Sequence, residues 1–206
     1  MNKAIIGVVV AVVLGAGSYF LFSGNREPET ILAAQALTEI TNPVLVIEVA
    51  GSTSGTIEIK LRSDLAPLHI ARITELANSG AYDGVAFHRV IDGFMAQTGD
   101  VEFGMIEGYD INRAGQGGST SPDIPAEFSD VPYVEGIVGM ARAQPVNSAN
   151  SQFFIMFDNA SSLNGQYTVI GEVISGMEVV HAIKRGVSPN GAVAENPDYM
   201  ERVTIK

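Results

Sequence analysis

A positively charged side chain stands beside an apolar stretch near the middle of this 206-residue chain. Arg89 comes shortly before Phe94, Met95 and Gln97. A guanidinium stays charged at physiological pH and offers several donors, so it can hydrogen-bond a lone pair or a carbonyl oxygen without titrating. Taken alone, however, an arginine in a strand-like segment is more often a solvent-exposed charge, and this one predicts no reaction by itself.

The rest of the composition argues against most other kinds of site. The chain has no cysteine, which excludes disulfides, thiol nucleophiles and thiolate metal ligands. Its histidines, His69, His88 and His181, lack metal-ligand spacing, so neither a metal nor another cofactor is predicted. Residues 115–118 are glycine-rich but lack the Lys-Ser/Thr of a phosphate loop. A net charge of −11 argues against a nucleic-acid partner.

Three segments together indicate a family. They are FHRVIDGFMAQTGD (residues 87–100), GMARA (139–143) followed by NSQFFI (150–155), and LNGQYTVIGEV (163–173). Each string is weak alone, but in this order and at these separations they closely resemble the cyclophilin family of peptidyl-prolyl cis-trans isomerases. The resemblance covers about residues 44–206. It implies an isomerase with a mainly β fold, a closed eight-stranded antiparallel barrel capped by two α-helices.

The resemblance also implies an active site on the outer face of the barrel. Arg89 matches the family's catalytic arginine. The pocket that takes the proline ring is matched by Phe94, Met95, Phe154 and Leu163. Met95 and Leu163 would otherwise be assigned to the core, so their role depends on the resemblance.

Other matches lie along the bound peptide. Gln97 and Gln152 match polar groups beside the substrate backbone, and Tyr167, which stands where many members have histidine, can still close one side of the proline pocket. The backbone of Ala141 and Arg142 matches the segment that holds the peptide. The resemblance therefore predicts proline-containing polypeptides as the partners of this site.

Such a site suits rotation about an X–Pro peptide bond. The barrier is ~18–20 kcal/mol because the C–N bond has partial double-bond character. In the twisted amide the proline nitrogen regains a lone pair, to which a guanidinium can donate. An apolar pocket fixes the ring and excludes water. The enzyme then only has to bind the twisted amide better than the planar one, without a nucleophile, a metal or a titrating base.

The hydrophobic periodicity predicts the elements that position these residues. Residues 44–49 and 56–62 form a hairpin. Pro67 begins a helix that ends at Gly80, and Ser175 with Glu178 fits a capping box for a second helix ending at residues 184–186. Further strands are expected at residues 85–91, 94–98, 137–143, 153–157, 167–174 and 202–205. This pattern, without βαβ alternation, favours a closed antiparallel barrel.

Adjacent residues on a strand face opposite sides. Of the pair Phe153 and Phe154, we therefore expect Phe153 in the core and, from the resemblance, Phe154 in the pocket. Phe87 is expected in the core. His88 is expected to make structural hydrogen bonds rather than to take part in catalysis.

The N-terminus is predicted to carry an export signal. Lys3 precedes residues 4–22, which are uncharged and apolar. At ~1.5 Å per residue they span roughly 28 Å as a helix, close to the thickness of a bilayer core. A signal anchor is favoured over a cleaved signal peptide, because no small-residue cleavage site directly follows the run.

The chain therefore divides into three expected parts. These are a signal anchor or signal peptide (1–22), a polar linker (23–42) and the isomerase domain (43–206). The domain is expected to be monomeric and to face the periplasm or the cell exterior, tethered to the membrane or released after cleavage.

The sequence departs from the family pattern in places. Ser162 stands where many members carry an aromatic residue, often Trp, that supports cyclosporin binding, so weak cyclosporin sensitivity is expected. Gly115 and Gly117 match a loop that borders a neighbouring pocket. Residues 101–114, just before them, are an insertion whose role the sequence leaves open. Arg142 replaces a common asparagine.

Three functions remain open. The first is an active isomerase that assists the folding of exported proteins. The second is a non-catalytic proline-peptide-binding or chaperone module that uses the same groove. The third is a membrane-anchored scaffold element, for which the sequence offers no dedicated surface.

Overall fold

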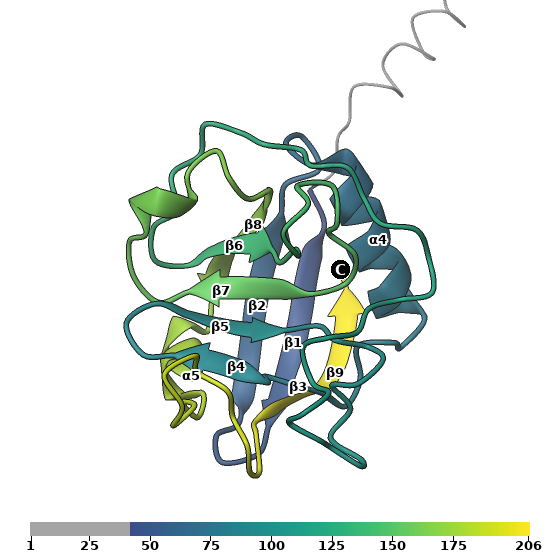
Figure 1. Ribbon diagram of the computed structural model, residues 1–206. Helices are drawn as coiled ribbons and strands as arrows, with labels where there is room; N and C mark the ends of the chain where they lie inside the picture. The colour runs from purple at the N-terminus through teal and green to yellow at the C-terminus, as the bar shows by residue number, and fades with distance from the viewer. Residues whose placement is uncertain (1–41) are drawn as a thin grey trace, which may run out of the picture. The chain divides into compact units, whose positions relative to one another are not determined.

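The structure is a computed structural model that describes residues 42–206, a nine-stranded antiparallel sheet with two α-helices (Figure 1). The strands are β1 (Val44–Ala50), β2 (Gly55–Leu61), β3 (Val85–Ala86), β4 (Arg89–Ile91), β5 (Met95–Thr98), β6 (Ile137–Met140), β7 (Phe153–Met156), β8 (Val169–Ser175) and β9 (Tyr199–Ile205). The helices are α4 (Pro67–Asn78) and α5 (Met177–Ala182), with a 3-10 turn at Ser161–Leu163. The predicted mainly β fold with two helices is confirmed for this part of the chain.

The prediction of a closed eight-stranded barrel was wrong in strand number and in closure. The strand order is β3-β9-β1-β2-β8-β6-β7-β5-β4, so β3 and β4 are the two edges. The expected strand 85–91 is divided because Val85–Ala86 pair with β9, with the Phe87 N–H continuing this register to the Asp198 carbonyl at 2.8 Å, whereas Arg89–Ile91 pair with β5. Only Phe87 and His88 separate the edge strands. The sheet therefore curls into a half-barrel whose edges meet through two residues.

Other segments cover both edges of the sheet. The Ala86 N–H of β3 donates to the Gly104 carbonyl at 2.8 Å, and the Val90 N–H of β4 donates to the Gly191 carbonyl at 2.7 Å. An uncovered edge would offer free backbone groups to another chain. The start of the inserted loop 101–114 thus covers the β3 edge of the sheet.

Alternation along the strands builds the main core inside the curl. Ile57, Ile59 and Leu61 of β2 are fully buried, and each such side chain contributes about 1.5–3 kcal/mol by leaving water. Phe87 and Phe153 belong to this core, as predicted. Helix α4 begins at Pro67 as predicted, and its buried apolar stripe packs beside β9.

A second apolar cluster lies on the other face of the central strands. Every residue of β6 and β7 is buried, because the main core covers one face of these strands and the second cluster covers the other. Phe154 belongs to this cluster while its neighbour Phe153 belongs to the core, so the prediction of opposite faces is confirmed. The cluster consists of Met95, Tyr133, Ile137, Phe154, Met156 and Val169.

The capping box predicted for the second helix is not formed. The N-cap of α5 is Gly176, with a φ of 89° and no side-chain cap, while Ser175 is the last residue of β8. A Cβ on Gly176 would collide with the Thr56 carbonyl, so the chain can turn there only with glycine. The helix ends at Ala182, before the cations Lys184 and Arg185 and the glycine Gly186 that were expected to close it.

Among residues 42–206, no helix is long and apolar enough to cross a membrane. The predicted signal segment and the linker up to residue 41 lie outside the described residues.

Candidate active site

Strand register places four residues in one row across the second face of the sheet. Arg89 on β4 pairs with Gln97 on β5, Gln97 pairs with Phe154 on β7, and Phe154 pairs with Gly139 on β6. Directly opposed residues of antiparallel strands point to the same side of the sheet. The fold thus aligns a cation, an amide and an aromatic ring that are widely separated in the sequence.

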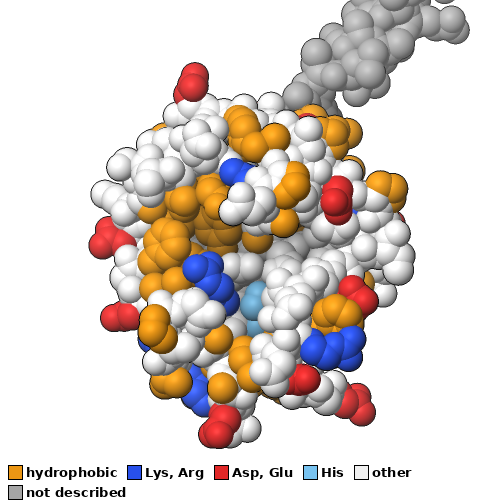
Figure 2. All heavy atoms as spheres, viewed as in Figure 1, with side chains coloured by type: hydrophobic (Ala, Val, Ile, Leu, Met, Phe, Trp, Pro, Cys, Tyr) orange, Lys and Arg blue, Asp and Glu red, His pale blue; other side chains and the backbone are white. Residues whose placement is uncertain are grey.

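A hollow of about 160 Å³ lies along this row. Figure 2 shows hydrophobic side chains gathered over the ends of β5 and β7, with a basic side chain beside them. The hollow combines an apolar surface with one cationic edge, the two features expected of a site for the twisted amide. Its lining consists of Arg89, Phe94, Met95, Gln97, Ala141, Arg142, Phe154, Leu163 and Tyr167.

Stacked aromatic rings form the floor of the hollow. Phe154 stacks on Tyr133, with ring centroids 5.8 Å apart, and meets Tyr167 edge-on at 5.8 Å. A Cβ on Gly139 would lie 2.6 Å from the Phe154 Cζ and collide with the Tyr133 hydroxyl, so glycine makes room for both rings. Sequence reasoning missed Tyr133, which lies in a loop without strand periodicity.

The Arg89 guanidinium is held on two sides. Its Nε donates to the Asn190 carbonyl at 2.9 Å, and its Nη1 donates to Gln97 Oε1 at 3.0 Å. Desolvation lowers the pKa of Arg89 below its ordinary value, yet a guanidinium starts so high that it stays charged near neutrality. Nη2 makes no hydrogen bond to any residue within 42–206, so its donors remain for a ligand. Asn190 could not be recognised from the sequence, because it contributes only a backbone oxygen.

Arg142 closes the opposite side of the hollow. Its guanidinium lies over the Tyr167 ring, 4.7 Å from the centroid, and donates from Nη2 to the Gln166 carbonyl at 3.1 Å. The sequence assigned this residue a backbone role only, so the side-chain contact with Tyr167 is an addition. Ala141 is anchored through its N–H, which donates to the Gln152 carbonyl at 2.9 Å.

A second hollow of about 350 Å³ adjoins the first and shares Gln97, Ala141 and Arg142 with it. Gly115, Gly117 and Gln152 also line it. Every predicted substrate-binding residue therefore lines one of two adjoining hollows on the same face. Their individual roles with a bound peptide remain predictions.

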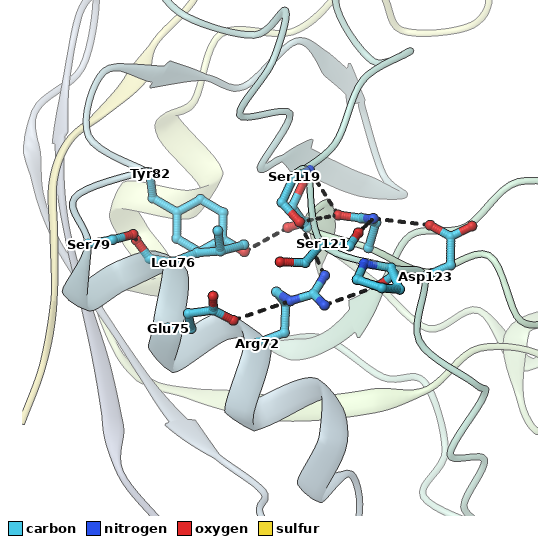
Figure 3. Close-up of polar contacts among 11 residues, drawn as sticks. Arg72, Glu75, Leu76, Ser79, Tyr82, Ser119, Ser121 and Asp123 are labelled. Carbon is cyan, nitrogen blue, oxygen red and sulfur yellow. Dashed lines mark hydrogen bonds and ion pairs between the residues drawn. The ribbon is translucent and has the colours of Figure 1, made fainter.

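The second hollow is anchored to α4 through the segment after Gly118 (Figure 3). Asn150 accepts from the Ser119 N–H at 2.8 Å and donates to Asp123 Oδ1 at 3.0 Å. Arg72 of α4 donates to Ser119 Oγ at 3.2 Å and to the Pro122 carbonyl at 3.0 Å. Helix α4 thereby fixes the lining of a hollow that its own residues do not line.

His88 does not make the structural hydrogen bonds predicted for it. His88 is 3% exposed, and neither ring nitrogen has a partner in hydrogen-bond geometry within residues 42–206, although the Ala86 backbone and the Gln152 side chain lie near enough to act on its pKa. The ring packs under Gly115, where an added Cβ would lie 3.0 Å from it. Desolvation lowers the pKa of His88 to about 4, partly opposed by the charge of Asp100, so the ring is neutral near pH 7. His88 supports the loop by packing.

Proteins named as peptidyl-prolyl cis-trans isomerases are similar in sequence to this chain. Residues 44–206 match the family described as cyclophilin type peptidyl-prolyl cis-trans isomerase/CLD. The chain is 59% identical over 153 residues to a Brucella suis biovar 1 protein named "Probable peptidyl-prolyl cis-trans isomerase", covering 74% of this chain and 78% of that protein. It is 34% identical over 164 residues to peptidyl-prolyl cis-trans isomerase A of Dickeya dadantii, covering 75% of this chain and 81% of that protein.

Solved structures show the same fold. The cyclophilin AquaCyp293 from Hirschia baltica superposes with a TM-score of 0.62 at 25% identity, over 78% of this chain and 73% of that one. A Cryptosporidium parvum cyclophilin-type isomerase, crystallised in the presence of the dipeptide Ala-Pro, superposes with a TM-score of 0.65 at 23% identity. The superposition covers 79% of this chain and 98% of that one. The chain belongs to the cyclophilin-type peptidyl-prolyl cis-trans isomerase family, a family of isomerases. The family and enzyme class predicted from the sequence are confirmed.

Proposed function

We propose that this protein isomerises X–Pro bonds of exported proteins, and that Arg89 accelerates the rotation by stabilising the twisted amide. One observation carries the proposal. A half-buried guanidinium with unused donors lies at the edge of a ring-sized apolar hollow, in register with its aromatic floor. The Cryptosporidium relative crystallised in the presence of Ala-Pro supports a proline dipeptide as the ligand of such a site.

The chemistry follows from what changes during rotation. In the planar amide the nitrogen lone pair is delocalised into the carbonyl and is a poor acceptor. As the bond twists, the lone pair localises on the proline nitrogen, and the Nη2 donors of Arg89 can bind it. A hydrogen bond made only in the twisted state lowers the barrier, whereas one made equally in both states would not.

The apolar part of the site holds the ring during this rotation. The proline ring packs against Phe154, Met95 and Leu163, and the preceding carbonyl turns while the ring stays in place. The half-buried position of Arg89 strengthens its electrostatic interaction, because fewer water molecules compete for its donors.

The experiment compares the purified full-length chain with its Arg89→Ala variant on an Ala-Pro peptide. We expect fast cis–trans conversion by the wild type and a large loss in the variant. Peptide binding without any acceleration by the wild type would instead support a non-catalytic proline-binding module and contradict the proposal.

We also propose that the domain works outside the cytoplasm. Residues 4–22 serve as a signal anchor, residues 23–42 as a linker, and the isomerase domain faces the periplasm or the cell exterior. The mass of the N-terminus from cell fractions tests this. An intact N-terminus in the membrane fraction is expected, a cleaved one indicates a signal peptide, and a cytoplasmic location contradicts export.

A further inference from the structure

One buried carboxylate closes the inserted loop at both ends. Asp100 follows β5 and is fully buried. Its Oδ1 accepts from the N–H groups of Glu102 at 3.1 Å and Phe103 at 2.9 Å. Its Oδ2 accepts from the N–H groups of Gly115 at 2.7 Å and Gly117 at 3.0 Å. The carboxylate thus fixes the peptide groups that precede Gly115 and Gly117.

The peptide groups that follow the same two glycines connect to Arg89 through two glutamines. The carbonyls of Gly115 and Gly117 accept from Gln152 Nε2 at 3.1 and 2.8 Å. Gln152 Oε1 accepts from Gln97 Nε2 at 2.9 Å. Gln97 Oε1 in turn accepts from Arg89 Nη1 at 3.0 Å.

All hydrogen bonds in this relay run in one direction, from Arg89 towards the loop. Each glutamine amide has one accepting oxygen and one donating nitrogen, so the partner on one side decides what it presents on the other. Because the glycine carbonyls take the nitrogen of Gln152, its oxygen faces Gln97. If those carbonyls turned away, both amides could flip, and Gln97 would present donors to the donors of Arg89.

We propose that Asp100 is a positioning residue for the isomerase reaction, which holds the Arg89 guanidinium towards the proline hollow through the glycine loop, Gln152 and Gln97. The inserted loop 101–114 becomes part of the site in this way, since Asp100 binds the backbone at both of its ends. The inference rests on the proposed arginine mechanism. It assigns Asp100 no contact with the substrate.

The chain offers a matched control in a second buried carboxylate. Asp198 is 1% exposed, and its carboxylate accepts from the N–H groups of Thr53 at 3.1 Å and Lys184 at 2.7 Å. It lines neither of the two hollows. Asp198→Asn therefore removes comparable structural hydrogen bonds without touching the relay.

A second variant disturbs Asp100 without replacing it. A Cβ on Gly117 would lie 2.6 Å from Asp100 Oδ1, and Gly117 does not have a positive φ. Gly117→Ala therefore pushes on the carboxylate, and also on Glu102 and Phe103 beside it, without a φ that disfavours alanine. It replaces Asp100→Asn if that variant does not fold.

The experiment measures kcat on an Ala-Pro peptide, the peptide Kd and the Arg89 Nε–H NMR signal in the full-length chain. For Asp100→Asn we expect kcat to fall about tenfold, the value of one well-placed hydrogen bond, with Kd changed less than about twofold and the Arg89 signal shifted. Gly117→Ala should also lower kcat and shift the signal. For Asp198→Asn we expect lower thermal stability with kcat and the Arg89 signal unchanged.

The outcomes separate this inference from the proposed mechanism. If Arg89→Ala is inactive but folded Asp100→Asn and Gly117→Ala keep the wild-type kcat and Arg89 signal, the relay is refuted and the arginine mechanism stands. If Arg89→Ala keeps the wild-type rate, the arginine mechanism fails. An equal loss of kcat in Asp198→Asn would show that Asp100 acts only through stability, and that would also refute the relay.

Discussion

Acidification should destabilise the folded protein through His88. Its ring is buried, its nitrogens have no hydrogen-bond partner within residues 42–206, and the charges that influence it are Asp100 and Arg89. Desolvation lowers its pKa to about 4 in the folded state, against 6.5 in an unfolded chain. Between these values the unfolded chain binds a proton that the folded protein does not. Stability is therefore fully present above pH 6.5 and is lost as the pH falls towards 4.

The gap between the two pKa values sets the magnitude. Each tenfold difference in proton affinity is worth about 1.4 kcal/mol, so the complete loss is about 3 kcal/mol, and about 2 kcal/mol is lost between pH 7 and pH 4.5. Other groups titrate in the same range. The effect is therefore isolated as the difference between the wild type and His88→Met, which fills similar space with an apolar side chain.

Urea unfolding at a series of pH values provides the assay. We expect His88→Met to be at least as stable as the wild type at neutral pH, because it removes two unpaired buried nitrogens. Its advantage should grow by about 2 kcal/mol on acidification to pH 4.5. A constant difference between the two proteins across this range would refute the reasoning, because His88 would then titrate alike in both states.

Two further predictions concern the lining of the proline hollow and its rim. Gly139→Ala should destabilise the protein by about 1–3 kcal/mol and raise the peptide Kd, because the new methyl group collides with the Phe154 ring. Urea unfolding measures the stability and an NMR titration measures the Kd. An unchanged Kd would contradict the prediction. Ser162 is exposed beside Leu163 and offers no aromatic surface, so cyclosporin should inhibit the wild type weakly and Ser162→Trp more tightly. An inhibition titration decides, and tight inhibition of the wild type would overturn the expectation.

Local patterns predicted the regular elements well. The alternation of Ile57, Ile59 and Leu61 fixed a hairpin strand, and Pro67 marked the start of α4. The divided strand at Phe87 was not predictable, because its two parts pair with β9 and with β5, and β9 is distant in sequence. The capping box at Ser175 failed because the strand continues to that residue, and Gly176 makes the turn.

The residues of the site also differ in whether local sequence patterns could predict them. Side chains that carry the motif, such as Arg89 and Phe154, could be placed from the ordered segments. Tyr133 and the Asn190 carbonyl could not, since one lies in a loop without periodicity and the other acts through its backbone. The relay from Asp100 could not be predicted, because it depends on the direction in which each amide donates in the folded protein.

The isomerase rate of Arg89→Ala tests the central claim most directly. Arg202, an exposed arginine on β9 that lines neither hollow, provides the matched control Arg202→Ala. With both proteins folded and binding the Ala-Pro peptide, we expect Arg89→Ala to lose about 10²–10³-fold in kcat, as when one preorganised donor is removed from a transition state. Arg202→Ala should match the wild type. A wild-type rate in Arg89→Ala would contradict the claim that this guanidinium stabilises the twisted amide.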